Sequence, residues 1–437
     1  MVSLENLYAI FQQHPVVCTD TRQLTPGCLF FALKGDNFDG NRFALQALEG
    51  GAAYAVVDAP GFEHEPRCLQ VGDVLTALQQ LANRHRRHFD IPVIAIGGSN
   101  GKTTTKELVS AVLSNHYPCH FTKGNLNNHI GVPLTLLAMP ADTEVAVVEM
   151  GTNQPGDIDQ LCAIAAPTHG LLTNIGKEHL EGFGNLQGVK KAESELFRYL
   201  ARHDGCVFVN TAEKYLASMA RGNRKKVLYA ASDALQSQDS LIDIRLLGET
   251  PFIRVEFLSE NDQPVDVQSQ LIGRHNFHNI MTAIALGVYF KVPAVKIKAA
   301  IEAYKPANNR SQLLQRGTNT FLLDAYNANP TSMRAALETL RSIRATNKVA
   351  ILGDMLELGA ESLNEHRQIL QFAVKCRFDQ LVVVGPEFGR CVASGKYKAQ
   401  HFPDTAAAKS WFAAQSFEHT FFLLKASRGI RLEGVIG

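Results

Sequence analysis

A short apolar run leads directly into a glycine-rich loop at residues 93–106, Val-Ile-Ala-Ile-Gly-Gly-Ser-Asn-Gly-Lys-Thr-Thr-Thr-Lys. Glycines let backbone N–H groups turn toward an anion, and the first turn of the following helix adds the positive end of its dipole. In this pattern Lys102 reaches the β- and γ-phosphates of a nucleoside triphosphate, and the Thr103 hydroxyl binds Mg²⁺. The loop therefore predicts a nucleoside triphosphate site.

The loop is also shorter than the common phosphate loop. Only three residues separate Gly97 from Gly101-Lys102, where the common pattern has four. This shorter spacing narrows the set of P-loop protein families to which the chain can belong. We expect the nucleotide and its metal to contact Gly98, Ser99, Asn100, Gly101, Lys102, Thr103 and Thr104.

Two further candidates follow predicted buried strands. Glu149 comes directly after the apolar run 145–148 and precedes a glycine-containing loop at 151–156. Parallel strands place their carboxyl ends at the ligand-binding edge of a sheet, which favours a metal-binding role for Glu149 over an ordinary acidic strand end. His179 follows the run 170–173. Considered alone, such a histidine is more often a surface or core-edge residue than a ligand.

Amide and acidic side chains gather in three other segments. The loop 124–133 contains Asn127 and Asn128, and the segments 324–330 and 353–359 follow apolar runs. We expect the segments 324–330 and 353–359 to face a shared cleft, and the amides of the loop 124–133 to recognise neutral polar groups. The alternative is that these residues act only as turn residues and helix N-caps.

Several enzyme classes are disfavoured because their motifs are missing. The guanine-reading sequence Asn-Lys-x-Asp is absent, since Asn347-Lys348 continues as Val-Ala, and this disfavours a GTPase switch protein. H-E-x-x-H, G-x-S-x-G and zinc-type Cys/His spacings are absent as well. Metalloprotease, serine hydrolase and structural-zinc functions have no support.

Composition indicates small-molecule partners and a reducing compartment. Lys plus Arg number 43 and Asp plus Glu number 42, and this balance argues against nucleic acid as the main partner. The 8 cysteines form no C-x-x-C pair and are expected to be reduced. The N-terminus resembles no signal peptide, and no stretch of about 18 apolar residues occurs. We expect a cytoplasmic protein without membrane insertion.

Alternating apolar runs and helical segments predict an α/β fold with three domains, because 437 residues are too many for one core. The apolar runs lack polar alternation, as expected of parallel strands buried on both faces. Residues 226–272 instead alternate and predict an antiparallel appendage to the central domain. The predicted domains are 1–91, 92–306 and 307–437.

Together these motifs resemble the Mur ligase family, whose members are ATP-dependent amide-forming enzymes of peptidoglycan precursor synthesis. The likeness spans nearly the whole chain and rests on segments 20–35, 38–43, 98–104, 122–134, 149–153, 179–184, 273–279, 324–329 and 353–359. Tyr326-Asn-Ala-Asn329 is specific to the branch that adds D-alanyl-D-alanine. The resemblance implies a monomer with a small N-terminal α/β domain that binds a uridine nucleotide, a central P-loop ATPase-like parallel-sheet domain and a C-terminal Rossmann-like ligase domain.

The resemblance also implies a mechanism. ATP phosphorylates the terminal carboxylate of UDP-N-acetylmuramoyl-tripeptide, the amine of D-alanyl-D-alanine attacks the acyl phosphate, and phosphate leaves. Lys102 and Thr103 then contact the γ-phosphate and Mg²⁺, while Glu149 and His179 are implied ligands of a second metal ion. Closure of the C-terminal domain would exclude water from the acyl phosphate.

Other roles carry over residue by residue. Asn279 matches the adenine-binding asparagine, and Arg310 and Asp324 match an arginine near the phosphates and an aspartate near the ribose. The uridine diphosphate segment contains Thr21, Arg22, Asp39, Gly40 and Asn41. The residues expected to bind the remaining substrate groups are Asn127, Asn128, Asn327, Asn329 and Arg428, with Ser427 beside the last of them.

One position departs from the family pattern. Members commonly carry a carbamylated lysine about 14 residues after the metal-binding histidine, and Glu193 occupies that place here. A carbamate is a carboxylate on a long arm, and a glutamate supplies similar oxygens with a shorter reach. We therefore predict that Glu193 replaces the modified lysine as a metal ligand and acts with Lys102 and His179 in catalysis.

Three alternatives compete with this reading. One is an amide ligase of the same architecture with another substrate, such as folate or an earlier peptidoglycan precursor. Another is a non-catalytic nucleotide-dependent regulator, which has no need for the full set Lys102, Thr103, Glu149 and His179. The third is a P-loop kinase acting on a hydroxyl group, which would form ADP without any amine.

Overall fold

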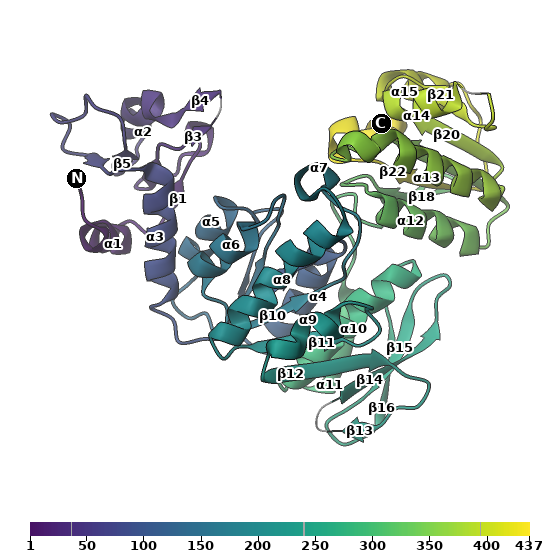
Figure 1. Cartoon of the computed structure of the whole chain (residues 1–437), viewed down its shortest axis with the longest axis horizontal. Helices are drawn as coiled ribbons and strands as arrows, with labels where there is room; N and C mark the ends of the chain where they lie inside the picture. The colour runs from purple at the N-terminus through teal and green to yellow at the C-terminus, as the bar shows by residue number, and fades with distance from the viewer. Residues whose placement is uncertain (36, 239–240, 394) are drawn as a thin grey trace.

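The computed structural model describes residues 1–35, 37–238, 241–393 and 395–437. The chain forms three α/β units in sequence order, and each is built around its own sheet (Figure 1). The predicted class, α/β with three domains, is confirmed. The predicted boundaries after residues 91 and 306 fall between strands of different sheets and stay a prediction.

The N-terminal unit contains a small parallel sheet in the order β1-β2-β5-β6. The two inner strands fall within the strand-like segments 27–33 and 53–58 of the sequence, and all their positions except Tyr54 are buried. Its elements are α1 (Leu4–Gln13), β1 (Val17–Cys18), η1 (Thr21–Gln23), β2 (Leu29–Phe31), β3 (Lys34–Gly35), β4 (Phe38–Asp39), η2 (Gly40–Phe43), α2 (Ala44–Glu49), β5 (Tyr54–Val57), β6 (Cys68–Gln70) and α3 (Val74–Arg86).

The central unit contains a 10-stranded sheet in the order β16-β15-β14-β12-β11-β10-β7-β9-β8, with β13 paired to β14. Every position of β7, β9 and β11 is buried, as expected of parallel strands covered on both faces. Its strands are β7 (Val93–Gly97), β8 (Cys119–Phe121), β9 (Val145–Glu149), β10 (His169–Leu172), β11 (Cys206–Asn210), β12 (Lys225–Ala231), β13 (Ser237–Gln238), β14 (Leu241–Gly248), β15 (Arg254–Leu258) and β16 (Pro264–Gln268). Its helices are α4 (Lys102–Ser114), α5 (Gly131–Leu137), α6 (Asp157–Ala165), α7 (Leu180–Phe183), α8 (Leu186–Arg202), α9 (Leu216–Met219), η3 (Ala220–Gly222), α10 (Arg274–Tyr289) and α11 (Ala294–Ala303).

The predicted appendage at 226–272 is in part wrong. Strands β14, β15 and β16 do pair antiparallel, as predicted. However, β12 pairs in parallel with both β11 and β14, so this region continues the central sheet rather than forming a separate attachment. The alternation of residues arises because this end of the sheet is only partly covered.

The C-terminal unit contains a six-stranded sheet in the order β17-β18-β22-β19-β20-β21, parallel except for the β17–β18 pair. The four inner strands match the apolar runs 320–323, 349–352, 381–384 and 421–424 of the sequence, whereas the edge strands β17 and β21 were not predicted. Its elements are β17 (Gln312–Arg316), β18 (Asn319–Asp324), α12 (Pro330–Ser342), β19 (Asn347–Gly353), η4 (Gly359–Glu361), α13 (Ser362–Cys376), β20 (Gln380–Val384), α14 (Pro386–Val392), β21 (Gln400–Phe402), α15 (Thr405–Ala413), β22 (Thr420–Lys425), η5 (Arg428–Ile430) and η6 (Leu432–Ile436).

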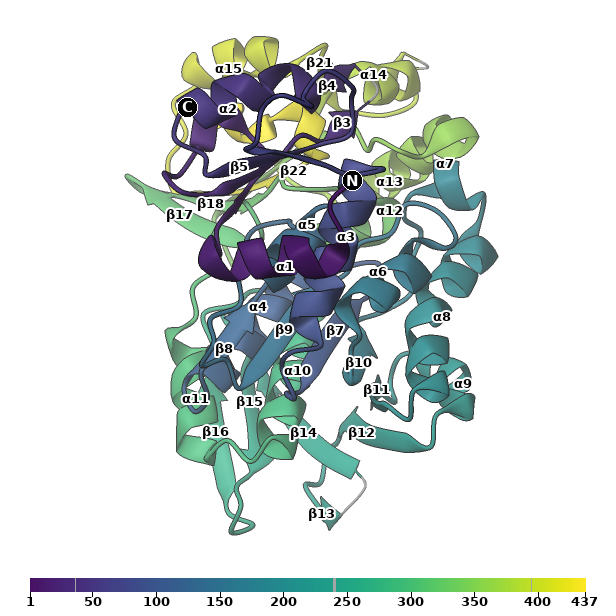
Figure 2. The same ribbon diagram turned by 90° about the vertical axis from the view of Figure 1, so that its left-hand side faces the viewer.

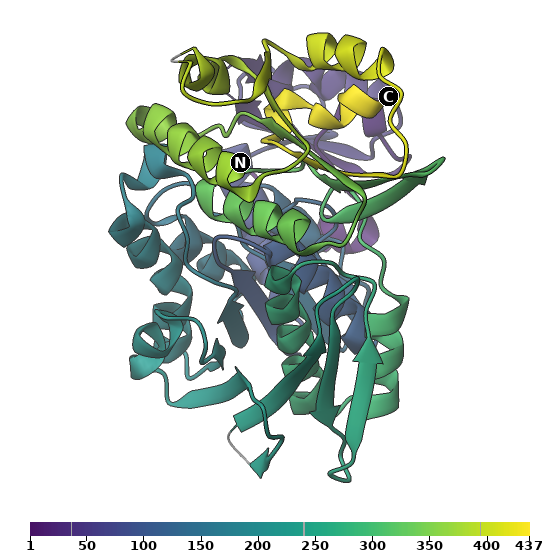
Figure 3. The ribbon, with the colours of Figure 1, turned by 90° about the vertical axis from the view of Figure 1, so that its right-hand side faces the viewer.

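The N-terminal and C-terminal units both lie over one end of the central unit (Figures 1 and 2). Figure 3 shows α12 and α13 of the C-terminal unit above the central unit. The chain reaches this position through Asn308 and Asn309, which both adopt positive φ angles after the last central helix. In the part of the chain that the structure describes, no helix has the length and apolarity to cross a membrane.

Candidate active site

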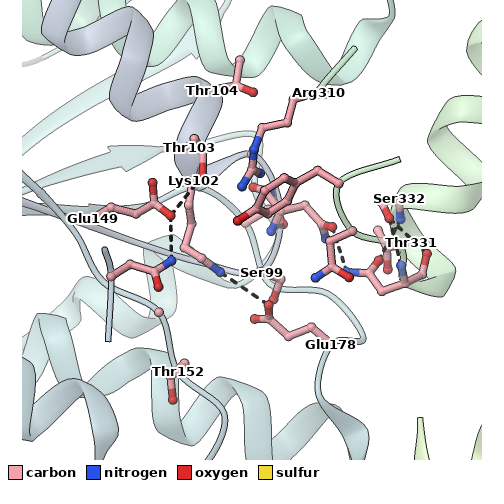
Figure 4. Close-up of a pocket in the computed structure, with 18 of the residues that line it drawn as sticks. Ser99, Lys102, Thr103, Thr104, Glu149, Thr152, Glu178, Arg310, Thr331 and Ser332 are labelled. Carbon is pink, nitrogen blue, oxygen red and sulfur yellow. Dashed lines mark hydrogen bonds and ion pairs between the residues drawn. The ribbon is translucent and has the colours of Figure 1, made fainter. Parts of the chain in front are cut away.

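A cavity of about 650 Å³ lies where the central and C-terminal units meet. Its walls come from the P-loop, the loop 125–129, the segment 174–179, the start of α10 and residues 310–335. Figure 4 shows Lys102, Thr103 and Glu149 facing Arg310, Thr331 and Ser332 of the C-terminal unit across it. Two domains therefore contribute side chains to one site, as the sequence predicted.

The P-loop follows β7 at an inner position of the central sheet. Gly98 and Gly101 have φ angles of +111° and +81°, which favour glycine. A Cβ on Gly101 would lie 2.6 Å from Oδ1 of Asn279, so the loop packs tightly against α10. The Ser99 and Asn100 N–H groups donate to the backbone and side-chain oxygens of Asn174, and the first-turn N–H groups of α4 remain as the anion-binding end.

Glu149 ends β9, beside the P-loop strand, and its side chain is 1 % exposed. Its Oε1 accepts hydrogen bonds from Thr103 Oγ1 at 3.0 Å and from Asn127 Nδ2 at 2.8 Å. Lys106 Nζ lies 3.7 Å from the second oxygen, Oε2, which has no hydrogen-bond partner. The structure thus brings together Thr103, Glu149 and Asn127, three residues singled out from the sequence.

Lys102 folds back over its own loop. Its ammonium donates to the Gly98 carbonyl and lies 3.5 Å from Glu178 Oε2 (Figure 4). Burial by itself would lower the pKa of Lys102, but the surrounding carboxylates, with Glu178 foremost, outweigh burial and raise the pKa above its ordinary value. Glu178 was not singled out from the sequence, although it directly precedes His179.

Glu193 lies beneath the P-loop, on α8, and is fully buried. Its Oε2 accepts a hydrogen bond of 2.8 Å from the Gly98 N–H. Burial, reinforced by the nearby Glu178 carboxylate, raises the pKa of Glu193 above its ordinary value, with Lys102 and the Gly98 N–H opposing the rise. Glu193 does not belong to the cavity wall, whereas Glu178 does.

His179 lies on the cavity wall with a positive φ of 42°. Its Nδ1 is 2.6 Å from Glu357 Oε2, so the predicted ligand pairs with a carboxylate of the C-terminal unit. This contact holds the pKa of Glu357 below its ordinary value. A second ion pair between the units joins Lys177 to Glu365 at 2.5 Å.

The predicted metal ligands lie in three places rather than one. Thr103 and Glu149 form one group, His179 pairs with Glu357, and Glu193 lies against the Gly98 N–H on the side of the P-loop where Glu178 contacts Lys102. Among the described residues, no three His, Cys, Asp or Glu side chains converge as a preformed metal site. Even so, three buried carboxylate oxygens around the P-loop lack hydrogen-bond partners, Glu149 Oε2, Glu178 Oε1 and Glu193 Oε1. Unsatisfied buried oxygens of this kind fit a hard cation such as Mg²⁺.

Asn279 lies on α10 under the P-loop, and both ends of its amide are occupied. Its Oδ1 accepts from Thr105 Oγ1 at 3.0 Å, and its Nδ2 donates to Asn276 Oδ1 at 2.9 Å. His275, which precedes Asn276 on the same helix, also lines the cavity, and its Nδ1 is buried without a hydrogen-bond partner. Burial lowers the pKa of His275. This histidine was not singled out, although it falls within the matched segment 273–279.

Arg310 and Asp324 both lie on the C-terminal wall of the cavity. The Arg310 guanidinium lies over the Tyr326 ring, 3.6 Å from its centroid. Asp324 Oδ2 forms an ion pair with the buried Lys425 Nζ at 2.7 Å. Burial alone would raise the pKa of Asp324, but Lys425 outweighs it and holds the pKa below its ordinary value.

The amides expected to bind substrate have structural partners. Asn329 is the N-cap of α12 within a capping box, and its Nδ2 donates to Asn100 Oδ1 at 2.8 Å. Asn128 Oδ1 accepts from the Gly131 N–H at the start of α5, and Asn327 Oδ1 accepts from the Ala328 N–H. Asn128, Asn327 and Asn329 also line the cavity, so a turn or cap role and a place in the cleft are both observed. No residue of the predicted cleft segment 353–359 lines the cavity, so that part of the prediction is wrong.

Two sets of predicted substrate residues lie outside this cavity. Arg428 is 59 % exposed and pairs with Glu433, while Ser427 is buried and donates to the Ala328 carbonyl. In the N-terminal unit, Thr21 and Arg22 belong to η1, and the Arg22 guanidinium pairs with Asp20. Asp39, Gly40 and Asn41 form a turn in which the buried Asn41 amide bonds to Asp39 and Asp58.

Comparison with known proteins places this architecture in one family. The Mur ligase middle domain matches residues 96–287, the Mur ligase glutamate ligase domain matches residues 309–428, and the Mur ligase family catalytic domain matches residues 15–86. These three matches follow the order of the three sheets along the chain.

Individual relatives cover nearly the full length. The UDP-N-acetylmuramoyl-tripeptide–D-alanyl-D-alanine ligase of Bacillus subtilis is 34 % identical over 96 % of this chain and 92 % of the relative, and that of Escherichia coli is 35 % identical with the same coverage. A crystal structure of MurF from Acinetobacter baumannii superimposes with a TM-score of 0.84, 31 % identity and coverage of 96 % of this chain and 92 % of that one. The ADP complex of MurF ligase from Thermotoga maritima has the same fold, with a TM-score of 0.83, 24 % identity and coverage of 100 % and 97 %. On sequence, domain order and fold together, this chain belongs to the Mur ligase family.

Proposed function

We propose that this chain is an ATP-dependent ligase that joins D-alanyl-D-alanine to UDP-N-acetylmuramoyl-tripeptide in peptidoglycan precursor synthesis. The relatives that match it over nearly their full length carry this name. The observation that carries the proposal is the two-domain cavity, in which Thr103 donates to Glu149 on one wall and the Asp324–Lys425 pair stands on the other. Such a site can close around an acyl phosphate and exclude water.

The P-loop side of the cavity positions ATP. The first-turn N–H groups of α4 face the phosphates, and Lys102 moves from the Gly98 carbonyl to the γ-phosphate. Thr103 and Glu149 would hold Mg²⁺, which when bound neutralises charge on the transferring phosphoryl group. Arg310, stacked on Tyr326, is preorganised to contact phosphate oxygens from the opposite wall.

The reaction then requires two chemical steps. The substrate carboxylate attacks the γ-phosphorus of ATP, and ADP leaves from an acyl phosphate. The amine of D-alanyl-D-alanine attacks the acyl carbon, and inorganic phosphate leaves. The residues of this chain contribute by binding, orientation and exclusion of water, which is where catalysis of phosphoryl transfer mainly lies.

The nucleoside end of ATP is proposed to lie near α10. Asn279 fixes the P-loop through Thr105, and its predicted role toward adenine is supported by its place on the cavity wall. Asp324 is proposed to face the ribose, next to His275. These roles, like those of Gly98 to Thr104, rest on the family match and on proximity.

The remaining substrate groups are assigned to three sets of residues. Thr21, Arg22, Asp39, Gly40 and Asn41 are proposed for the uridine diphosphate, with Asn41 acting by shaping the turn because its amide is occupied. Asn127 and Asn128 are proposed to bind substrate through their amides, and Asn327 and Asn329 are proposed to hold D-alanyl-D-alanine. Arg428 is proposed for the D-alanyl-D-alanine carboxylate, which requires it to leave Glu433. We propose that the chain acts as a cytoplasmic monomer.

Glu193 is proposed to replace the carbamylated lysine of related enzymes. Its support is the buried, unpartnered Oε1 next to the P-loop. The expected result is that Glu193→Ala loses most activity and that bicarbonate does not stimulate the wild type. Strong stimulation by bicarbonate, or a fully active Glu193→Ala variant, would contradict this role.

The decisive experiment measures ADP release with UDP-N-acetylmuramoyl-tripeptide, with and without D-alanyl-D-alanine. We expect sustained release only when both are present, together with formation of the pentapeptide product by mass spectrometry. Release that is indifferent to the dipeptide would indicate a kinase and would refute the ligase. Activity with glutamate and folate, or with single amino acids on shorter precursors, would identify another ligase of the same architecture.

A further inference from the structure

Lys102, Glu178 and Glu193 converge beneath the P-loop. Lys102 Nζ is 3.5 Å from Glu178 Oε2, and the charges of both carboxyl groups act on it. Glu193 Oε2 accepts from the Gly98 N–H at 2.8 Å, and the carbonyl of the same glycine accepts from the Lys102 ammonium. Glu178 is 4 % exposed and Glu193 is fully buried, so solvent does little to screen the pair.

Each carboxyl group has one oxygen in use and one without a partner. Glu178 Oε2 faces the Lys102 ammonium, and Glu193 Oε2 accepts from the Gly98 N–H. Oε1 of each residue is buried and has no hydrogen-bond partner in the described structure. The two buried carboxyl groups offer free oxygens to a cation, and Lys102 is the cation that now lies against Glu178.

Lys102 cannot stay there during catalysis. Its ammonium is bound to the Gly98 carbonyl, one turn back along its own loop, and not to the phosphate-binding end of α4. A P-loop lysine contacts the β- and γ-phosphates. When nucleotide draws Lys102 forward, Glu178 and Glu193 lose their neighbouring cation.

We propose that Lys102 and a divalent cation alternate at the Glu178–Glu193 pair. The lysine occupies the pair in the absence of nucleotide, and the metal takes its place when nucleotide binds. Glu178 thereby becomes a cation-binding residue of the site, in addition to those predicted from the sequence. This inference rests on the proposed nucleotide-dependent function, and it explains why an acidic residue precedes His179 on the cavity wall.

The first test uses Mn²⁺ alone, with the full-length chain and no nucleotide. Electron paramagnetic resonance counts free and bound Mn²⁺. We expect Lys102→Met to bind one more Mn²⁺ per chain than the wild type, because removal of the ammonium exposes the pair. Adding Glu178→Gln or Glu193→Gln to Lys102→Met should weaken that binding at least tenfold.

Lys177→Met is the matched control, because Lys177 directly precedes Glu178 in the sequence but its ammonium pairs with Glu365. It should bind no additional Mn²⁺. Thermal unfolding gives a second readout and also shows whether each variant is folded. Mn²⁺ should raise the melting temperature of the Lys102→Met variant, but not that of the double variant that also carries Glu178→Gln. If Lys102→Met binds no more Mn²⁺ than wild type, or if Glu178→Gln leaves its binding unchanged, the proposal is wrong.

The second test uses the wild type with a non-hydrolysable ATP analogue. The analogue should increase the number of Mn²⁺ ions bound per chain more in the wild type than in the Glu178→Gln variant. An equal increase in both proteins would overturn the proposal. Failure of the ligase assignment is separate, because it would appear as ADP release indifferent to D-alanyl-D-alanine while Mn²⁺ binding by Lys102→Met could still be observed.

Discussion

Asn329 Nδ2 in the C-terminal unit donates a 2.8 Å hydrogen bond to Asn100 Oδ1 in the P-loop. The same side chain uses its Oδ1 to cap α12 through the Ser332 N–H at 2.9 Å. One amide therefore starts a helix of one domain and contacts the nucleotide loop of another. The position of the C-terminal unit and the geometry of the P-loop are linked through this residue.

The two roles of Asn329 can be separated by substitution. Asn329→Asp keeps an oxygen cap but loses the donor to Asn100, so we expect near-wild-type stability and a KM for ATP raised about fivefold, the effect of one hydrogen bond. Asn329→Ala should also lose about 1 kcal/mol of stability with the cap. Asp404→Ala, which removes the cap of α15, should lower stability alone. An unchanged KM in Asn329→Asp would show that the Asn100 contact does not serve the nucleotide site.

Gly101 permits a close approach that alanine would prevent. Gly101→Ala places a Cβ 2.6 Å from Asn279 Oδ1 at a φ of +81°, and we expect kcat/KM for ATP to fall at least about 100-fold, as P-loop and α10 are forced apart. Gly124→Ala shares the positive φ of +56° but meets nothing within 4 Å. It should remain within about fivefold of wild type. Equal losses in the two variants would attribute the effect to backbone strain alone. For both variants, ADP release measures activity and the melting temperature measures stability.

Thr103 is predicted to act through its hydroxyl. Thr103→Val keeps the shape but leaves Glu149 with one hydrogen bond fewer, and removes the hydroxyl proposed for Mg²⁺. We expect kcat/KM for ATP to fall by about 10²–10³ at fixed Mg²⁺, the range typical of a lost electrostatic contact in an active site. Thr103→Ser, which keeps the hydroxyl, is the control and should retain most activity. A Thr103→Val enzyme with more than a tenth of wild-type activity would rule out this role.

Asp324 makes stability depend on pH in a defined direction. Its folded pKa is held below the ordinary value of 3.8, so the unfolded chain binds more protons in acid. The stabilisation is present above about pH 4 and is lost as the pH falls through the folded pKa. Asp324→Asn should lower the free energy of unfolding by about 3 kcal/mol at pH 7, because Lys425 is left buried without its ion-pair partner. This loss should become smaller as the pH falls below 3.8, where Asp324 of the wild type takes up a proton.

The C-terminal unit carries its own probe for this measurement. Trp411 is the only tryptophan in the sequence, and it packs against Phe402 and Phe417. Its fluorescence in thermal unfolding at pH 7, 5 and 3.5 reports that unit. Thr320→Val, a change on the same strand away from the ion pair, should show a difference from wild type that does not vary with pH. A pH-independent difference for Asp324→Asn would refute the linkage.

The amino-acid sequence is sufficient to predict the most buried strands of the central and C-terminal sheets and the loops that follow them. Runs such as 93–96 and 145–148 are apolar throughout, which is the pattern expected of parallel strands covered on both faces. Because such strands align their carboxyl ends, the sequence also placed Lys102, Thr103 and Glu149 at one edge. It did not reveal that β12 continues the parallel sheet, since partial burial imposes the same alternation on parallel and antiparallel strands.

Contacts between side chains far apart in the sequence depend on the packing of the folded chain. Glu193 reaches the Gly98 N–H, Lys425 pairs with Asp324, and His179 pairs with Glu357 of another domain. No local pattern encodes these pairs, because each depends on how helices and domains pack rather than on the periodicity of a segment. Glu178 illustrates the difference. Next to His179 in sequence it is one more acidic residue, and only burial beside Lys102 and Glu193 makes it a candidate for binding a cation.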